Sequence, residues 1–144
     1  MRFASLGSGS KGNATLVLAG DVLVMVDCGF SLRETERRLQ RLNLAASQLS
    51  AILVTHEHSD HCAGVARLSK RYDIPVYLTH GTAASGRCDG AAELRCFNSD
   101  ESFHIGEVHV HAVRVPHDAV EPCQYRLEWQ QRHLGILTDL GCVT

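Results

Sequence analysis

Short apolar segments recur along the whole chain and alternate with polar turns, many of which contain glycine. Segments of this length that are rich in valine, isoleucine and leucine are typical of β-strands. The dipeptide Gly20-Asp21 predicts a tight hairpin, and residues 130–132 predict a second one. We therefore predict strands at residues 2–6, 14–19, 22–26, 51–54, 75–78, 94–97, 102–105, 107–115, 123–129 and 133–138.

Two segments have the residue spacing of helices instead. Ser31 is a favourable N-cap and Glu34 stands three residues later, so we predict a helix that begins with a capping box and reaches about Leu42. A second helix is predicted from Asp60 to about Tyr72. Many strands with a few flanking helices predict an α+β layered fold.

The densest group of reactive side chains follows directly after one predicted strand. The apolar run at 51–54 leads into the sequence Thr-His-Glu-His-Ser-Asp-His at 55–61. Imidazole nitrogens and carboxylate oxygens are the ligands that zinc and similar divalent ions prefer. Ligands this closely spaced cannot all bind one tetrahedral ion. We interpret them as two ions side by side, with His56 and His58 on one and Asp60 and His61 on the other. A polar surface loop rich in histidine is the alternative.

Two further ligand-type residues also follow predicted strands. His117 comes just after the strand at 107–115, and Asp139 comes just after the strand at 133–138. Each of them alone would be interpreted as a loop or turn residue. Because both repeat the arrangement at 56–61, where ligand-type side chains follow an apolar strand, we interpret both as candidate metal ligands.

The composition limits the classes of protein that the chain can represent. The 144 residues are 44% hydrophobic and 21% charged, which is enough apolar material for one core. The formal net charge of −2 neither favours nor excludes a nucleic-acid partner. No apolar run has the length of a membrane span, and the N-terminus lacks the pattern of a signal peptide. We therefore predict a cytoplasmic protein without a membrane partner.

Cysteine usage leaves two interpretations. The chain has six cysteines and no C-x-x-C pair. An even number is compatible with three disulfides in a secreted protein. Reduced thiols, several of them buried as small hydrophobic side chains, agree better with the predicted cytoplasmic location.

The pattern His-x-His-x-Asp-His at 56–61, followed by His117 and Asp139, resembles the metal-binding motif of the metallo-β-lactamase-fold hydrolases. The flanking sequence is similar to one branch of that family, the YycJ/WalJ-type proteins. This similarity extends over nearly the whole chain and rests on residues 3–10, 12–14, 27–29, 116–119 and 138–141. The family fold is a four-layer αββα sandwich, so the resemblance implies that residues 1–144 form such a domain.

The resemblance also implies a dinuclear metal centre. Its ligands would be divided between the ions as follows: His56, His58 and His117 on the first, Asp60 and His61 on the second, and Asp139 bridging both. Asp60 and Asp139 would be the catalytic carboxylates that hold and aim the attacking water. Asp27 would orient a ligand histidine, as metal-bound imidazoles usually require. A simple turn residue before Gly29 is the alternative interpretation of Asp27.

The chain departs from the family pattern after Asp139, where a ligand of the second metal site is expected. A final histidine near the C-terminus completes the second metal site in this family, and no histidine follows Asp139 here. We therefore expect the chain to be the N-terminal part of a longer protein, with its metallo-β-lactamase-like domain incomplete at the C-terminus. A sheet face that meets the missing part would be exposed, which predicts self-association.

The function implied by the resemblance is that of a metal-dependent hydrolase with two divalent ions. The imidazole ligands favour Zn²⁺, with Mn²⁺ or Fe²⁺ as alternatives. The YycJ/WalJ-type branch implies a phosphodiesterase, specifically a 5′-to-3′ DNA exonuclease, with DNA as the substrate. A glyoxalase-type thioesterase or lactonase would use the same ligands on a carbonyl group. A metal-binding module without turnover is the third hypothesis.

Overall fold

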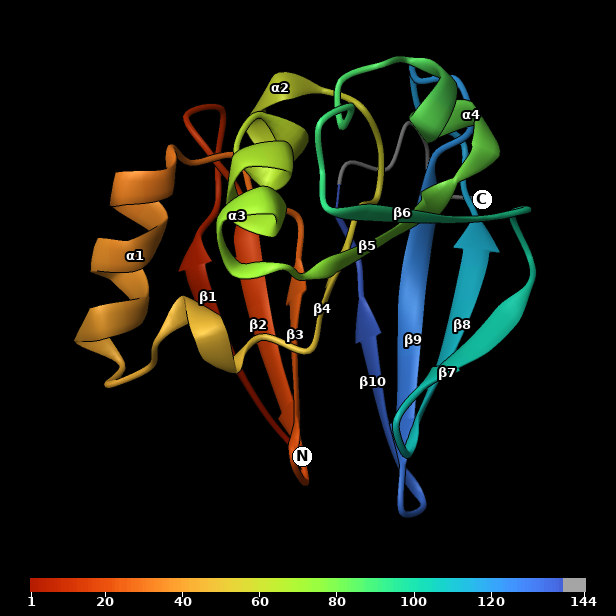
Figure 1. Ribbon diagram of the computed structural model, residues 1–144. Helices are drawn as coiled ribbons and strands as arrows, with labels where there is room; N and C mark the ends of the chain where they lie inside the picture. The colour runs from red at the N-terminus through yellow and green to blue at the C-terminus, as the bar shows by residue number, and fades with distance from the viewer. Residues whose placement is uncertain (139–144) are drawn as a thin grey trace.

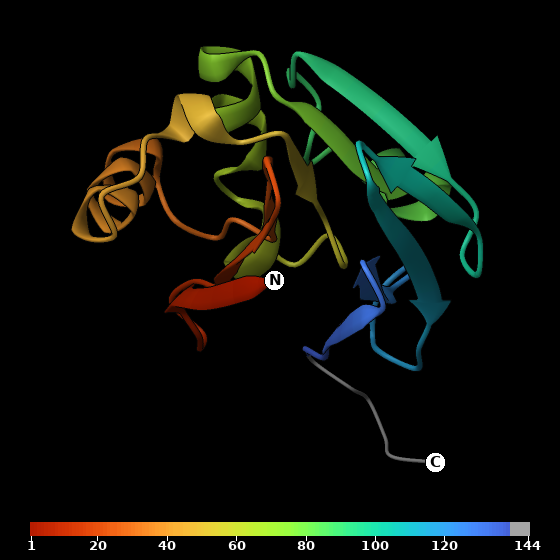
Figure 2. The same cartoon turned by 90° about the horizontal axis from the view of Figure 1, so that it is seen from below.

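Two β-sheets pack face to face in the computed structural model, which describes residues 1–138. Helices lie over the outer face of the first sheet (Figures 1 and 2). The first sheet has the strand order β1-β2-β3-β4-β5-β6 and the second has the order β10-β9-β8-β7. Pairing is antiparallel from β1 to β3, parallel from β3 to β6, and antiparallel throughout the second sheet. The α+β prediction is confirmed.

The elements have the following bounds. The first sheet contains β1 (Arg2–Gly7), β2 (Ala14–Ala19), β3 (Val22–Val26), β4 (Ala51–Leu53), β5 (Pro75–Thr79) and β6 (Glu93–Phe97). The second sheet contains β7 (Ser102–Ile105), β8 (Val108–Arg114), β9 (Cys123–Trp129) and β10 (Arg132–Ile136). The helices are α1 (Leu32–Arg41), the 3₁₀ turn η1 (Ala46–Gln48), α2 (Ser59–Cys62), α3 (Val65–Tyr72) and α4 (His80–Ala84).

The central strands of the first sheet lie between two hydrophobic cores, one under the helices and one between the two sheets. Successive side chains of a strand point to opposite faces, so Met25 and Ile52 face the helices while Val24 and Leu53 face the second sheet. All four side chains are buried. A sheet covered on both faces requires continuous apolar strands, which explains why the segments 22–26 and 51–54 show no polar alternation.

Helix α1 begins after Ser31 as the sequence predicts, but the Glu34 side chain does not complete the capping box. The Ser31 hydroxyl accepts a hydrogen bond from the Glu34 backbone N–H at 3.2 Å, which is the N-cap half of the predicted capping box. The Glu34 carboxylate turns away from Ser31 and pairs with Arg37 and Arg38 at 2.7 and 2.8 Å. These two cations lower the pKa of Glu34 to about 2.

The single helix predicted from Asp60 to about Tyr72 is wrong, because the structure divides it into α2 and α3. Gly64 stands at the break, where its N–H donates to the Cys28 carbonyl at 2.9 Å. A Cβ atom on Gly64 would lie 1.9 Å from the Phe30 carbonyl oxygen. The chain therefore bends at Gly64 to bring the start of α2 against the loop that follows β3.

Two smaller expectations are also decided by the structure. The last hairpin turns at Gln130 and Gln131, both with positive φ, so Arg132 belongs to β10 and not to the turn. Within residues 1–138 every cysteine is a free thiol, and only Cys96 is exposed. The structure therefore favours reduced thiols over disulfides; Cys142 lies outside the described residues.

Strands β1 and β10 form open edges on the same side of the two sheets (Figure 2). A hollow between them is lined by Met1, Phe3, Arg132, His133 and Leu134. Phe3 is 69% exposed, and Leu137, just after β10, is 72% exposed. Self-association through these apolar edges stays a prediction. None of the helices in the described part of the chain is long and apolar enough to cross a membrane.

Candidate metal centre

The predicted ligands gather where three strand ends meet. The loops after β3 and β4 leave the carboxyl ends of two neighbouring parallel strands, and the loop at 115–122 joins β8 to β9. The second sheet is tied to this point because Cys123 donates its N–H to the Thr55 carbonyl at 3.0 Å and the Tyr125 hydroxyl donates to the Val54 carbonyl at 2.6 Å. Ligand sites in open α/β sheets lie at such strand ends.

Three imidazoles converge in this position. His56 is buried, and His58 and His117 are half-buried. One ring nitrogen from each lies within 4.8 Å of the others, and His117 Nε2 is 3.3 Å from His58 Nδ1. Three nitrogen donors with an open side match the ligand set of a catalytic zinc ion. The residues present therefore fit a divalent metal ion.

His61 and Asp60 lie beside this trio. The His61 ring is fully buried, and its centroid is 4.3 Å from that of His56. The Asp60 Oδ2 atom lies 3.6 Å from His61 Nε2, and the Asp60 side chain is 27% exposed. The structure thus brings all five of the predicted ligands among residues 1–138 into one cluster, whereas Asp139 lies outside the described residues.

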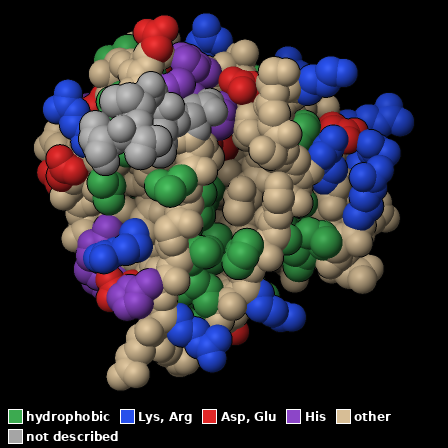
Figure 3. All heavy atoms as spheres, turned by 180° about the vertical axis from the view of Figure 1, so that it is seen from behind, with side chains coloured by type: hydrophobic (Ala, Val, Ile, Leu, Met, Phe, Trp, Pro, Cys, Tyr) green, Lys and Arg blue, Asp and Glu red, His purple; other side chains and the backbone are tan. Residues whose placement is uncertain are grey.

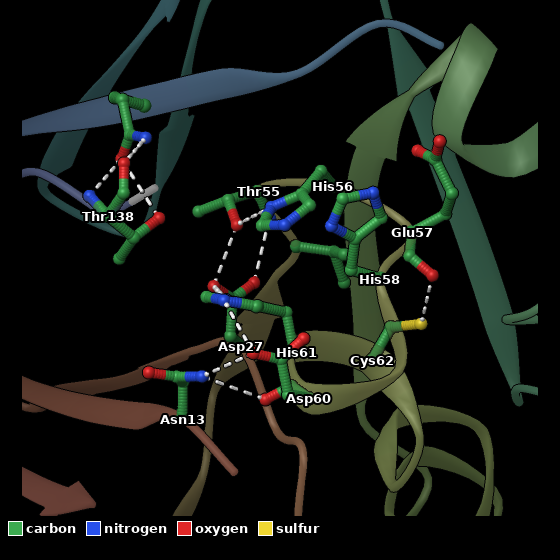
Figure 4. Close-up of polar contacts among 12 residues, drawn as sticks. Asn13, Asp27, Thr55, His56, Glu57, His58, Asp60, His61, Cys62 and Thr138 are labelled. Carbon is green, nitrogen blue, oxygen red and sulfur yellow. Dashed lines mark hydrogen bonds and ion pairs between the residues drawn. The ribbon is translucent and has the colours of Figure 1, made fainter. Parts of the chain in front are cut away.

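Asp27 lies under the cluster with its carboxylate fully engaged (Figure 4). Its Oδ2 atom is 2.7 Å from His61 Nδ1 and accepts the Thr55 hydroxyl at 2.7 Å, while Oδ1 accepts the Thr55 N–H at 2.8 Å. Burial raises the pKa of Asp27, and the contacts with His61 and Thr55 oppose that rise. The contact with Nδ1 leaves Nε2 of His61 facing the side where Asp60 lies.

Thr55 is a site residue that the sequence did not single out. Its hydroxyl oxygen is 2.8 Å from His56 Nδ1. Because the single hydroxyl proton is donated to Asp27, the Thr55 oxygen acts as the acceptor for a proton on His56 Nδ1. With Nδ1 protonated, Nε2 is the unprotonated nitrogen of His56 and the one that could bind a metal ion.

Asn13 is a second residue that the sequence did not single out. Its Nδ2 atom donates to the Gly9 carbonyl at 2.8 Å, and to the Asp60 carbonyl and Oδ2 atom at 3.1 and 3.2 Å (Figure 4). Its backbone N–H also donates to the Asp60 carbonyl, at 2.8 Å. Asn13 therefore fixes Asp60 against the loop at 8–12, across 47 residues of sequence.

Comparison with known proteins agrees with this geometry. The family model of the metallo-β-lactamase superfamily matches residues 7–131. The chain belongs to that superfamily. It is 35% identical, over its whole length, to exodeoxyribonuclease YycJ of Bacillus anthracis, and 31% identical, over 99% of its length, to exodeoxyribonuclease WalJ of Streptococcus pneumoniae. The chain spans 56% and 55% of these two relatives.

The fold agrees with the same family. The solved structure of Rm3 metallo-β-lactamase superposes on 92% of this chain with a TM-score of 0.76, at 20% identity, and 56% of that protein is covered. The two sheets and the helices over the first sheet therefore belong to the metallo-β-lactamase sandwich that the sequence predicts.

Glu57 lies between the candidate ligands of this metallo-β-lactamase domain but has a different contact. Its Oε1 atom accepts the Val120 backbone N–H at 2.9 Å. Val120 belongs to the loop that carries His117, so this bond holds that loop against the His56–His61 segment. Although Glu57 stands in a loop, its side chain is half-buried and hydrogen-bonded.

Gly29 allows a close approach between two backbone segments of the site. A Cβ atom there would lie 1.9 Å from the Asp60 carbonyl oxygen. We expect Gly29→Ala to push the Asp60 segment away and to lower the free energy of unfolding by about 2–3 kcal/mol, as overpacking does. Urea unfolding monitored by circular dichroism measures this change.

The matched control is Gly135→Ala in β10, where nothing lies within 4 Å of the added Cβ. It should change the free energy of unfolding by less than about 0.5 kcal/mol. Equal stability of the two variants would contradict the close contact at Gly29.

Proposed function

We propose that this site is a dinuclear metal centre that hydrolyses phosphodiester bonds in DNA, as a 5′-to-3′ exonuclease. The convergence of His56, His58 and His117, with Asp60 and His61 beside them, is the observation that carries the proposal. The names of the relatives matched over the whole chain support DNA as the substrate. Such a substrate agrees with the cytoplasmic location that the sequence predicts.

Each candidate ligand has a proposed role. His56, His58 and His117 would hold the first ion, Asp60 and His61 the second, and Asp139 would bridge them. Imidazole donors favour zinc, with Mn²⁺ or Fe²⁺ as alternatives. Two adjacent divalent ions would lower the pKa of a water molecule and neutralise the charge that develops at phosphorus.

The residues around the ligands would keep the catalytic geometry fixed. Asp27 orients His61, and Thr55 orients His56. Asn13 holds the Asp60 carboxylate in position. The Asp60 side chain is nevertheless 27% exposed, so solvent reaches it. In this proposal the carboxylate would orient an attacking water and accept its proton.

The loop at 8–12 is the surface that we assign to the DNA backbone. It is linked to Asp60 through Asn13, and Lys11 on it is exposed. Gly7 to Gly12 line a hollow together with Phe30 and Arg38. Arg38 is fixed because it donates to the Leu6 carbonyl and lies 4.1 Å from the centroid of the Phe30 ring. Backbone N–H groups and a lysine in a loop of this kind suit a phosphate.

The function is tested by a substrate panel given to the longest form of the protein that its gene encodes, after loading with Zn²⁺ or Mn²⁺. The panel contains DNA labelled at the 5′ or 3′ end, a phosphodiester chromogen, a glutathione thioester and a lactone. We expect DNA to be degraded from its 5′ end and a chelator to stop the reaction.

Two outcomes of the panel would overturn the proposal. Turnover of the thioester or lactone without DNA cleavage would make the protein a carbonyl hydrolase of the same fold. A fully metallated protein that turns over none of the substrates would be a metal-binding module without catalysis.

A further inference from the structure

A second group of ligand-type side chains crosses the outer face of the second sheet. Strand pairing places His104 opposite His109, His109 opposite Glu128, and Glu128 opposite His133. Residues paired across antiparallel strands point to the same face. These side chains therefore form one row across β7, β8, β9 and β10, and His111 adds a neighbour two residues along β8. Figure 3 shows histidine side chains gathered on this part of the surface, beside basic side chains.

The spacing within the row suits one metal ion. The Glu128 Oε2 atom is 2.7 Å from His111 Nε2 and 4.0 Å from His109 Nδ1. One ligand atom each from His109, His111 and Glu128 lies within 4.8 Å of the others. Ligand atoms around a tetrahedral zinc ion lie roughly 3.4 Å apart, since zinc–ligand bonds are about 2.0–2.1 Å long. Small rotations of these side chains would bring the three ligand atoms to the separation that a tetrahedral ion requires.

We propose that His109, His111 and Glu128 bind a divalent transition-metal ion, with zinc the best match, at a site separate from the His56–His117 centre. His133 is the fourth ligand, because its Nδ1 atom lies 3.7 Å from Glu128 Oε1 and its side chain is 52% exposed and free to rotate. A bound ion would link β8, β9 and β10 across the second sheet.

The two sites lie at different places on the second sheet, one on its outer face and the other beyond the end of β8. Val110 and Ala112, which alternate with the two β8 histidines, are buried in the core between the sheets. His109 and His111 therefore point to the opposite face. The His56–His117 centre lies beyond the end of β8, in the loops after β4 and β8. One ion cannot use both sets of ligands.

A simpler explanation is a surface hydrogen bond between His111 and Glu128. That bond accounts for one imidazole and leaves the other histidines of the row unexplained, including His104, which stacks on His109 at 4.3 Å between centroids. Arg126 lies 3.6 Å from Glu128 and competes with a cation, but its side chain is 51% exposed and can turn outward. The side chains of His109, His111 and Glu128 are only 25–33% exposed, which restricts their rotation.

The test measures zinc binding in a protein whose catalytic centre has been removed. The background carries His58→Ala, Asp60→Ala and His117→Ala, so that both ions proposed for the catalytic centre lose ligands. It is titrated with Zn²⁺ alone in equilibrium dialysis with elemental analysis. We expect about one equivalent of zinc to remain bound. Adding His109→Ala and His111→Ala should remove it, whereas adding His80→Ala, at an exposed histidine in α4, should not.

Measuring the Tm distinguishes a variant that has lost its zinc site from a variant that does not fold. Zinc should raise the Tm of the background protein, because a ligand that binds only the folded state stabilises it. In Glu128→Gln, which keeps the size of the side chain, the zinc-induced shift should be lost while the Tm without zinc stays close to that of the background. Absence of zinc from the background protein, or zinc binding unchanged by the His109 and His111 replacements, would overturn the proposal.

Discussion

Replacement of His58 by alanine should reduce DNA hydrolysis by the full-length protein by about 10³-fold or more, since a catalytic metal supplies several kcal/mol of transition-state stabilisation. His58 is half-buried, and its Nδ1 atom lies 3.3 Å from His117 Nε2. Its loss leaves two imidazoles at the first ion. The rate of release of 5′-labelled nucleotides at saturating DNA measures the effect.

The matched control is His80→Ala, an exposed histidine in α4 that is not among the candidate ligands. Its rate should equal that of the unmodified protein. A His58→Ala variant that hydrolyses DNA as fast as this control, under the same metal concentration, would contradict the assignment of His58.

Replacement of Asp139 by alanine should be equally severe, because two ions would lose the ligand that they share. Asp139 lies outside the described residues, so this prediction rests on the sequence motif and on the residue before it. The Thr138 N–H donates to Gln124 Oε1 at 2.9 Å, and Gln124 is adjacent to Cys123, whose N–H donates to Thr55. Thr138, the last described residue, is therefore bonded to β9 next to the residue of β9 that contacts the metal loop.

Metal content and turnover together decide the role of Asp139. We expect Asp139→Ala to retain less metal than the unmodified protein and to hydrolyse no DNA above background. The control is Asp21→Ala in the exposed turn between β2 and β3; Glu57→Ala is unsuitable because Glu57 holds the His117 loop through Val120. Equal metal content and equal turnover in the Asp139 and Asp21 variants would refute bridging.

The strands and the position of the ligand cluster could be predicted because local signals specify them. The strand at 51–54 is apolar without interruption because both of its faces are buried. The His56–His61 motif follows it directly, so its place at a strand end is determined by sequence order alone. The Gly20-Asp21 turn and the Ser31 N-cap act in the same local way.

The features that could not be predicted depend on contacts between distant segments. Asn13 meets Asp60 across 47 positions, and the break at Gly64 arises because Phe30 approaches its backbone. The row of His109, Glu128 and His133 exists only through the register of three strands. In the sequence alone, these histidines look like the polar face of half-exposed strands.

The central claim is that His56, His58 and His117 hold a metal ion, and its most direct test is elemental analysis of the purified protein after metal-replete expression. The analysis should use a variant with His109→Ala and His111→Ala, so that the second cluster contributes nothing. We expect at least about one equivalent of a divalent transition metal per chain, with zinc favoured by the donor set. Less than about a tenth of an equivalent of any such metal in a folded protein would contradict the claim.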